Sequence, residues 1–179
     1  MIKKIFNSSR GFTVLESIVA IAVLSLSVAG VFSAVQQSLS QAIIAKDEVK
    51  AFYLAQEAIE IIRNKRDTNQ LSKINTGSGN WLDGIVGVSD CSIGGICKVD
   101  AYAADKIQSC VTNCENLRQN QTTFLYGYDG SWVATNFKRE IQIESINANE
   151  ISVTVRISWT KGSLPPFVFK AKTHLFNWI

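Results

Sequence analysis

The feature that most constrains the fold of this chain is a long apolar run that begins at Phe12 and contains one carboxylate, Glu16. No other charged residue occurs between Phe12 and Lys46. About 20 consecutive apolar residues are enough for a helix to cross a bilayer, and segment 12–35 meets this length. A carboxylate at the bilayer centre costs about 2.5–3.5 kcal/mol, so one that is kept should have a partner. The sequence therefore predicts one membrane helix in which Glu16 has a specific role.

The run follows a short basic segment that ends in Gly11. The junction Arg10-Gly11-Phe12-Thr13-Val14-Leu15-Glu16 resembles the class III signal of type IV prepilins and pseudopilins, which has Gly, then Phe or Met, then Glu. The resemblance implies that a prepilin peptidase cuts between Gly11 and Phe12 and methylates the new N-terminus. It also implies that residues 12–35 become the packing helix of a filament, in which Glu16 pairs with the Phe12 amine of a neighbouring subunit.

Two other interpretations of the N-terminus are weaker. A secretory signal peptide has an apolar core of about 7–15 residues followed by a cleavage site, whereas Gly11 precedes the apolar run here. An uncleaved signal anchor would explain the cytoplasmic basic residues Lys3, Lys4 and Arg10. It would not explain Glu16, nor a helical pattern that continues beyond the membrane. A mature chain that starts at methylated Phe12 would distinguish the prepilin from the anchor.

The helical pattern predicts one helix over residues 12–66, with an amphipathic second part, 36–66. Spacings of three and four define a broad apolar face, which consists of Ala51, Leu54, Ala55, Ala58, Ile59 and Ile62. We assign Glu57 to the opposite, polar face. The stretch from Leu54 to Arg63 also resembles a segment of many minor pilins and pseudopilins.

Residues 67–121 are rich in Asn, Ser, Gly and Thr and lack a sustained period. We expect a loop-rich connection with short elements, which in pilin-like proteins is the variable αβ-loop. A connection this long is usually functional or covalently braced. All four cysteines lie in it, and an even number in an extracytoplasmic domain favours disulfides. We choose the local pairs Cys91–Cys97 and Cys110–Cys114; a zinc site is the rival, without C-x-x-C spacing or a nearby His.

The C-terminal segment, 122–179, has the period of two that is typical of strands with one buried face. Apolar side chains alternate with polar ones over 151–159, and similar patterns precede and follow this strand, with turn residues between them. Phe137, Arg139, Ile141 and Ile143 share one side of the preceding strand. The sequence predicts an α+β fold, in which a three- or four-stranded antiparallel meander packs on the amphipathic part of the helix.

Composition argues against several classes of function. The formal net charge is +3, and the leader, residues 1–11, contributes all of this excess, so the remaining side chains carry no basic surplus of the kind that nucleic-acid binding requires. The one histidine, His174, falls on a predicted strand, and nothing in the sequence connects it to a catalytic serine and acid. Gly77-Ser78-Gly79 does not lie between a strand and a helix, as a phosphate-binding loop would. We expect neither an enzyme nor a bound cofactor or metal.

These observations favour a structural subunit, a minor pilin, of a type IV pilus or related filament. The alternatives are a type II secretion pseudopilin and, third, a signal-anchored protein with no filament role. The expected partners are other pilin subunits, the prepilin peptidase, the inner-membrane assembly platform and the membrane itself. We expect the protein to span the inner membrane once before assembly and then to lie in an extracytoplasmic filament.

Overall fold

The computed structural model describes residues 11–87, 91–103, 106–110, 112–162 and 165–178. The chain divides into two compact units, an N-terminal unit over residues 1–46 and a globular unit over residues 47–179. Their secondary structure is an apolar N-terminal helix and a C-terminal antiparallel sheet, which confirms the predicted α+β class. The two units are described separately below.

Helix α1 covers Val14–Thr76, so it starts two residues later and ends ten residues later than the predicted 12–66. The helix continues beyond residue 66 because polar side chains in its last turns form contacts with other parts of the globular unit. Gln70 is buried and donates to Asn177 Oδ1 at 2.8 Å, while Asn69 Nδ2 donates to the carbonyl oxygen of Asp83 at 2.7 Å. The helix stops where Gly77 adopts a positive φ of 72°, the conformation that commonly ends a helix.

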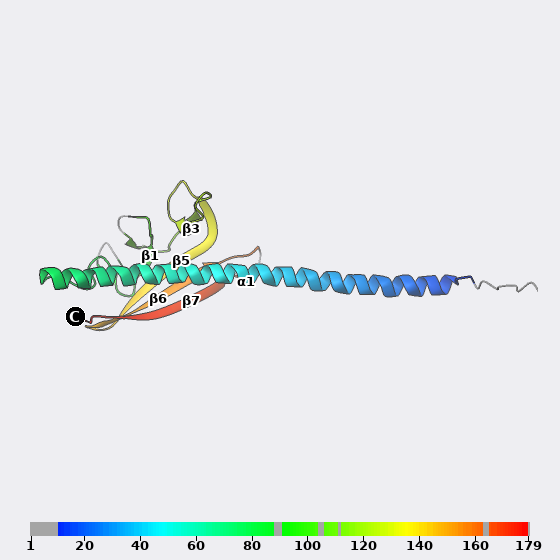
Figure 1. Ribbon diagram of the computed structural model, residues 1–179, viewed down its shortest axis with the longest axis horizontal. Helices are drawn as coiled ribbons and strands as arrows, with labels where there is room; N and C mark the ends of the chain where they lie inside the picture. The colour runs from blue at the N-terminus through cyan, green and yellow to red at the C-terminus, as the bar shows by residue number, and fades with distance from the viewer. Residues whose placement is uncertain (1–10, 88–90, 104–105, 111, 163–164, 179) are drawn as a thin grey trace, which may run out of the picture. The chain divides into compact units, whose positions relative to one another are not determined.

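The globular unit contains one seven-stranded antiparallel sheet (Figure 1). Its strands are β1 (Ile96–Val99), β2 (Ile107–Ser109), β3 (Asn116–Gln119), β4 (Tyr126–Gly127), β5 (Val133–Asn147), β6 (Glu150–Trp159) and β7 (Phe167–Phe176). The meander of β5, β6 and β7 confirms the predicted alternation. The sheet has seven strands where we predict three or four, because the four short strands, of two to four residues each, show no readable period.

The long strand β5 organises this sheet. One of its edges pairs with β6 over most of its length, and its other edge pairs with β3 and then with β1. Figure 1 shows the pronounced bend of β5 between these two partners. The loop-rich region 67–121 therefore contributes three strands to the sheet and is not a separate layer.

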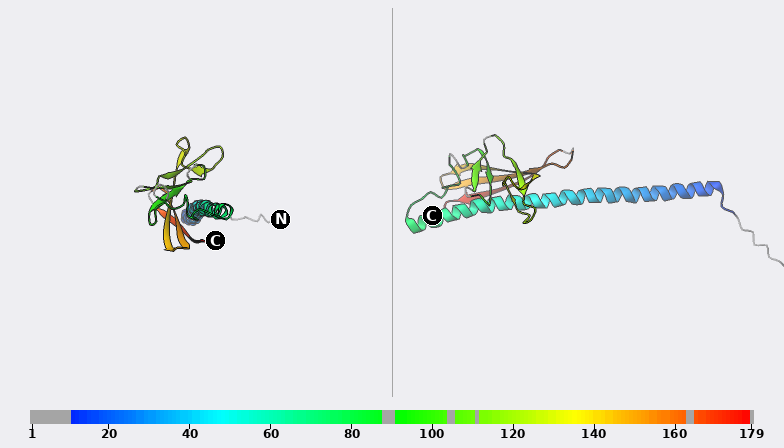
Figure 2. Two further views of the ribbon diagram at one scale, coloured as in Figure 1. Left: turned by 90° about the vertical axis from the view of Figure 1, so that its left-hand side faces the viewer. Right: turned by 90° about the horizontal axis from the view of Figure 1, so that it is seen from above.

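The part of α1 that belongs to the globular unit packs along one face of the sheet (Figure 2). Its buried apolar residues are Ala51, Leu54, Ala55, Ala58 and Ile62, which confirms the predicted apolar face. Three of these are alanines, so the helix backbone can approach the sheet closely. Opposite them the sheet buries Ile141, Val155 and Ile157, and Trp159 stacks between two phenylalanine rings.

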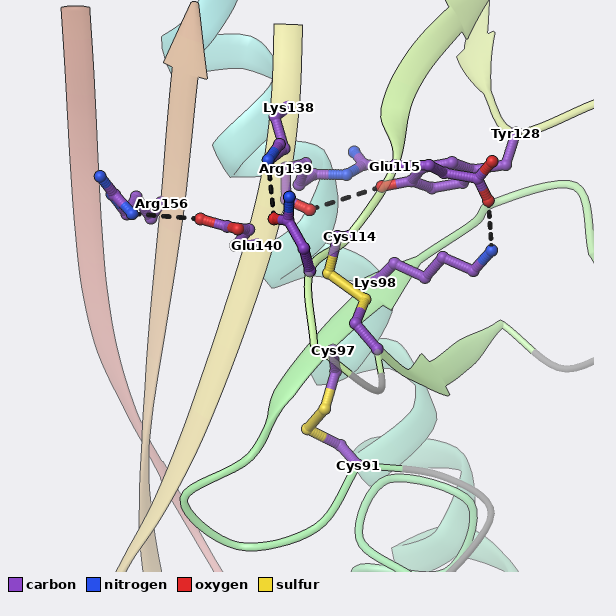
Figure 3. Close-up of a disulfide and its surroundings, with 12 residues drawn as sticks. Cys91, Cys97, Lys98, Cys114, Glu115, Tyr128, Lys138, Arg139, Glu140 and Arg156 are labelled. Carbon is purple, nitrogen blue, oxygen red and sulfur yellow. Dashed lines mark hydrogen bonds and ion pairs between the residues drawn. A yellow bond between two sulfur atoms is a disulfide. The ribbon is translucent and has the colours of Figure 1, made fainter. Parts of the chain in front are cut away.

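The structure joins Cys91 to Cys97 and Cys110 to Cys114, and these bonds use all four cysteines (Figure 3). No cysteine is left as a thiolate for the rival zinc site. Cys91 and Cys97 are fully buried, and Cys97 lies on β1. The second pair bridges the turn between β2 and β3. Both disulfides thus close short loops within the αβ-loop region and brace its short strands.

We predict that peptide mapping of non-reduced protein from cells recovers these two local pairs. Each pair closes a loop with a sequence separation of 6 or 4 residues. Loops this short stabilise by about 2 kcal/mol each in the chain-entropy relation. The double change Cys110→Ala and Cys114→Ala should therefore lower the free energy of unfolding by about that amount. A recovered Cys91–Cys110 or Cys91–Cys114 peptide would contradict the assignment.

Candidate functional site

The predicted cleavage site lies just before the helix. Gly11 and Phe12 are both exposed and precede the first helical residue, Val14. Among the residues that the structure describes, none has an atom within 4 Å of the position that a Cβ on Gly11 would occupy. The Gly11–Phe12 peptide bond is therefore outside the helical hydrogen-bond ladder and accessible, as proteolysis requires.

Thr13 sets the helix start. Its side-chain Oγ1 accepts a hydrogen bond from the Glu16 backbone N–H at 3.2 Å, and its carbonyl accepts one from the Ser17 N–H at 3.1 Å. This is an N-cap, in which a Thr side chain satisfies one of the free N–H groups of the first turn. The expected start at Phe12 is corrected for this reason. The pattern Thr13-Val14-Leu15-Glu16 is a capping-box signature that the sequence interpretation missed.

The same cap places Glu16 in the first turn of α1. A carboxylate there is favoured by the partial positive charge of the helix N-terminus, by about 0.3–1 kcal/mol at an exposed position. Within the described ranges, Glu16 forms no ion pair. The helix end thus supplies a weak intramolecular interaction, and no cationic side chain of the described chain neutralises the carboxylate.

Within the described residues, nothing in the N-terminal unit covers the apolar side chains of its helix. Every apolar residue from Phe12 to Ile43 is exposed. Helix α1 is the one described helix that is long and apolar enough to cross a membrane by length and composition. Burying a Val, Leu, Ile or Phe side chain contributes about 1.5–3 kcal/mol, so this surface requires lipid or protein around it.

Comparison with known families gives a match in this same region. Residues 6–32 match the prokaryotic N-terminal methylation motif. This is the N-terminal motif of a type IV pilin-like prepilin. No curated protein and no solved structure matches the chain significantly. The predicted leader, residues 1–11, falls outside the described residues except for Gly11.

The globular unit contains a buried cation that links three elements. Arg139 on β5 is fully buried. Its Nη1 donates to the carboxylate of Glu57 at 2.6 Å and to the carbonyl oxygen of Leu54 at 3.2 Å, both on α1. Its Nη2 donates to the carbonyl oxygen of Val99 on β1 at 2.6 Å. One guanidinium therefore connects the helix, the sheet and the αβ-loop region.

This contact corrects the assignment of Glu57 to the polar face. The Glu57 side chain is one-third exposed and turns toward the sheet, where Arg139 lies between Phe137 and Ile141 on the inward side of β5. A charge at an inward position requires a partner, because an unpaired buried charge is very costly. The strand alternation placed Arg139 inward, and this rule could have identified the need for a helix carboxylate.

A second polar cluster surrounds the Cys110–Cys114 disulfide (Figure 3). Lys98 Nζ lies 2.6 Å from Glu115 Oε1 and 4.8 Å from the centre of the Tyr128 ring. Burial raises the pKa of the Tyr128 phenol above its ordinary value, and the nearby Arg139 guanidinium partly opposes that shift. The phenol donates to the Arg139 carbonyl oxygen at 3.5 Å and stays neutral at physiological pH. These contacts brace the sheet and offer no reacting group.

His174 lies on β7, as predicted, and its side chain is exposed. Its Nδ1 lies 2.8 Å from Glu150 Oε1. Ser152 stands opposite His174 in the strand register, but it is almost completely buried. A nucleophile that substrate cannot reach does not form a catalytic triad, so this pair is interpreted as a surface contact.

We predict that Arg139→Met lowers the free energy of unfolding of the globular unit by about 3 kcal/mol, because it removes one partner of a buried ion pair. Glu57→Gln should cost about 1 kcal/mol, since the amide oxygen can still accept a hydrogen bond and the site is partly solvated. In the ion pair of Lys172 and Glu144, both side chains are exposed. Lys172→Met is therefore the matched control, and it should lower the free energy of unfolding by less than about 0.5 kcal/mol. Chemical denaturation of the three variants measures these differences, and equal losses for Arg139→Met and Lys172→Met would contradict the interpretation.

Proposed function

We propose that the protein is a structural subunit, a minor pilin, of a type IV pilus or a related filament. The observation that supports this most is the combination of the N-terminal methylation motif with an apolar helix whose whole circumference is exposed in the N-terminal unit. The motif belongs to proteins that are processed and then assembled. The exposed helix is a surface that assembly can bury.

Assembly moves this surface from one apolar environment to another. In the membrane, lipid chains surround the helix of residues 14–35; in a filament, the helices of other pilin subunits replace the lipid. Lipid is as apolar as these side chains, so close packing and polar contacts, rather than the hydrophobic effect, must favour helix association. A paired charge is the strongest such contact that this segment can make.

Glu16 supplies one half of that pair. Cleavage after Gly11 creates a cationic amine at Phe12, and the segment between Thr13 and Ala45 contains no cationic side chain. The amine of a neighbouring subunit is therefore the partner that we propose for Glu16. Pairing in a low-dielectric bundle offsets the cost of both charges and fixes the axial register of the two helices.

The remaining roles follow from this arrangement. The prepilin peptidase and the inner-membrane assembly platform are the proposed transient partners, and other pilin subunits are the lasting ones. Before assembly the chain spans the inner membrane once, with its globular unit outside the cytoplasm, where disulfides persist. A type II secretion pseudopilin would use the same N-terminal chemistry. Recovery of the protein in sheared surface fibres favours the pilus.

We predict that Gly11→Leu leaves the precursor unprocessed. The structure gives Gly11 no tertiary contact, so the change should not affect folding and should act only on entry of the chain into a narrow peptidase site. Intact mass of membrane-extracted protein measures the outcome. The matched control Gly30→Leu, also at a glycine without neighbours within 4 Å, should still be cleaved. Normal N-terminal trimming of Gly11→Leu would refute the cleavage site.

We predict that Glu16→Val is processed normally but enters filaments about ten-fold less than the parent, which corresponds to about 1.4 kcal/mol. Membrane insertion should be unchanged or better, because a costly charge is absent. Ser17→Val at the adjacent position is the control and should assemble like the parent. The measurement is the ratio of each variant in sheared fibres to that in membranes. Equal ratios for Glu16→Val and Ser17→Val would exclude a guiding role for the carboxylate.

A further inference from the structure

Strand β7 forms a long open edge of the sheet. It pairs with β6 over ten register positions without a bulge, and no other described strand pairs with it. Only at its end does another element reach its backbone, where Arg66 donates to the Phe176 carbonyl oxygen at 3.0 Å. Proteins usually protect such edges with short strands, prolines, bulges or charged side chains, especially lysines. Strand β7 has no proline or bulge within Phe167–Phe176, and its protection against pairing with a like strand consists of Lys170 and Lys172.

The outward face of this edge carries two lysines and one histidine at alternate positions. Lys170, Lys172 and His174 are all exposed on the side of the sheet away from α1. The register aligns Lys170 with Arg156 on β6 and Arg156 with Glu140 on β5. Since Arg156 is paired with Glu140 at 3.2 Å, Lys170 faces a second cation across the strand pair. Like charges at opposed positions are destabilising, and a carboxylate on a further strand would relieve this one.

Lys172 and His174, the next two outward residues of β7, each lie beside a carboxylate. Lys172 has Glu144 at 4.0 Å, with both side chains about half exposed, and His174 lies beside Glu150. Such exposed pairs are weak and can rearrange. The edge therefore presents Lys170 and Lys172 two residues apart, a spacing that matches the side-chain period of an added strand.

The inward side of the same edge is apolar and incompletely filled. A groove of about 130 Å³ lies between α1 and β7 and is lined by Phe52, Ala55, Gln56, Ile59, Phe169 and Ala171. The inward side chains of β6 are buried, whereas those of β7 are mostly half-buried. The helix thus leaves room beside β7 for an apolar side chain from one further strand.

We propose that the free edge of β7 binds an extended segment of a partner protein, in which acidic side chains alternate with apolar ones, by strand addition. The acidic residues lie opposite Lys170 and Lys172 on the outer face, and an apolar residue enters the groove beside Phe169. A second copy of β7 is disfavoured because it would bring lysines against lysines. This interaction belongs to the globular unit and goes beyond filament assembly.

The test uses the full chain in detergent micelles and three labelled ten-residue peptides, with binding measured by fluorescence polarisation. The first peptide alternates Glu and Val, the second alternates Lys and Val, and the third is the Glu–Val peptide with alternate backbone amides N-methylated. We expect the first peptide to bind at least about ten-fold more tightly than the other two, a difference of about 1.4 kcal/mol. Equal binding of the first two, or undiminished binding of the third, would overturn the proposal.

Charge-exchange variants locate the site. The double change Lys170→Glu and Lys172→Glu should weaken binding of the Glu–Val peptide about ten-fold and strengthen that of the Lys–Val peptide, and this gain excludes simple unfolding. The control, Lys106→Glu with Lys138→Glu, makes the same change of charge away from the β7 edge and should leave both affinities unchanged. If the parent chain forms a dimer, and the double change Lys170→Glu and Lys172→Glu weakens or strengthens that dimer, the occupant of the edge is a second copy. This result would overturn the proposal. Because Glu16→Val leaves the globular unit intact, its peptide binding separates this test from that of filament assembly.

Discussion

The structure depends on one helix that must satisfy two different surroundings. In the N-terminal unit α1 is apolar on every side, whereas in the globular unit only one face of it is apolar. The second part obtains its stability from the sheet, through alanines that permit close approach and through the contact of Arg139 with Glu57 and the Leu54 carbonyl. The first part obtains no tertiary stability within its own unit and depends on its environment. The second part of α1 thus serves the folding of the globular unit, and the first part is the one that we propose for filament assembly.

The ion pair of Arg139 and Glu57 shows why a buried charge can be kept in a small domain. Replacing such a pair with apolar residues is often neutral or stabilising, so stability alone does not explain it. Arg139 also donates to the Val99 carbonyl on β1, and β1 belongs to the αβ-loop region. We suggest that the pair fixes how the αβ-loop region docks. The two disulfides act within that region, and Arg139 anchors it to the helix and to β5.

The sequence predicted those parts of the fold whose patterns extend over many residues. The apolar face around Ala55 and the alternation around Val155 are long enough for their periods to be unambiguous. The strands β1 to β3 were not located, because β1 and β3 are held by pairing with β5, and β2 by pairing with β1, rather than by patterns of their own. Strand β4 lies within 122–179, the segment that the sequence assigned to the sheet. The end of α1 was placed too early, since polar Asn69 and Gln70 were taken as loop residues. Both are helical because they bond to segments that are distant in sequence.

The candidate sites divide in the same way. Gly11, Phe12 and Glu16 could be proposed from the sequence because the methylation motif is local and contiguous. The partnership of Glu57 and Arg139 joins residues that are 82 positions apart, so only an argument from the cost of a buried charge could have suggested it. The open edge of β7 depends on which strands pair, and this topology is not encoded in any short segment.

The helix cap at Thr13 has a consequence for the proposed removal of the leader. Because the first helical hydrogen bonds begin at Thr13, removal of the leader breaks no backbone bond of α1 and requires no unwinding. Under the proposed cleavage after Gly11, the precursor and the mature subunit would share the same helix and would differ in net charge and in the position of the amino terminus. Cleavage would then change the charge at the end of a helix that is already formed, and it would control when a subunit can assemble without refolding it.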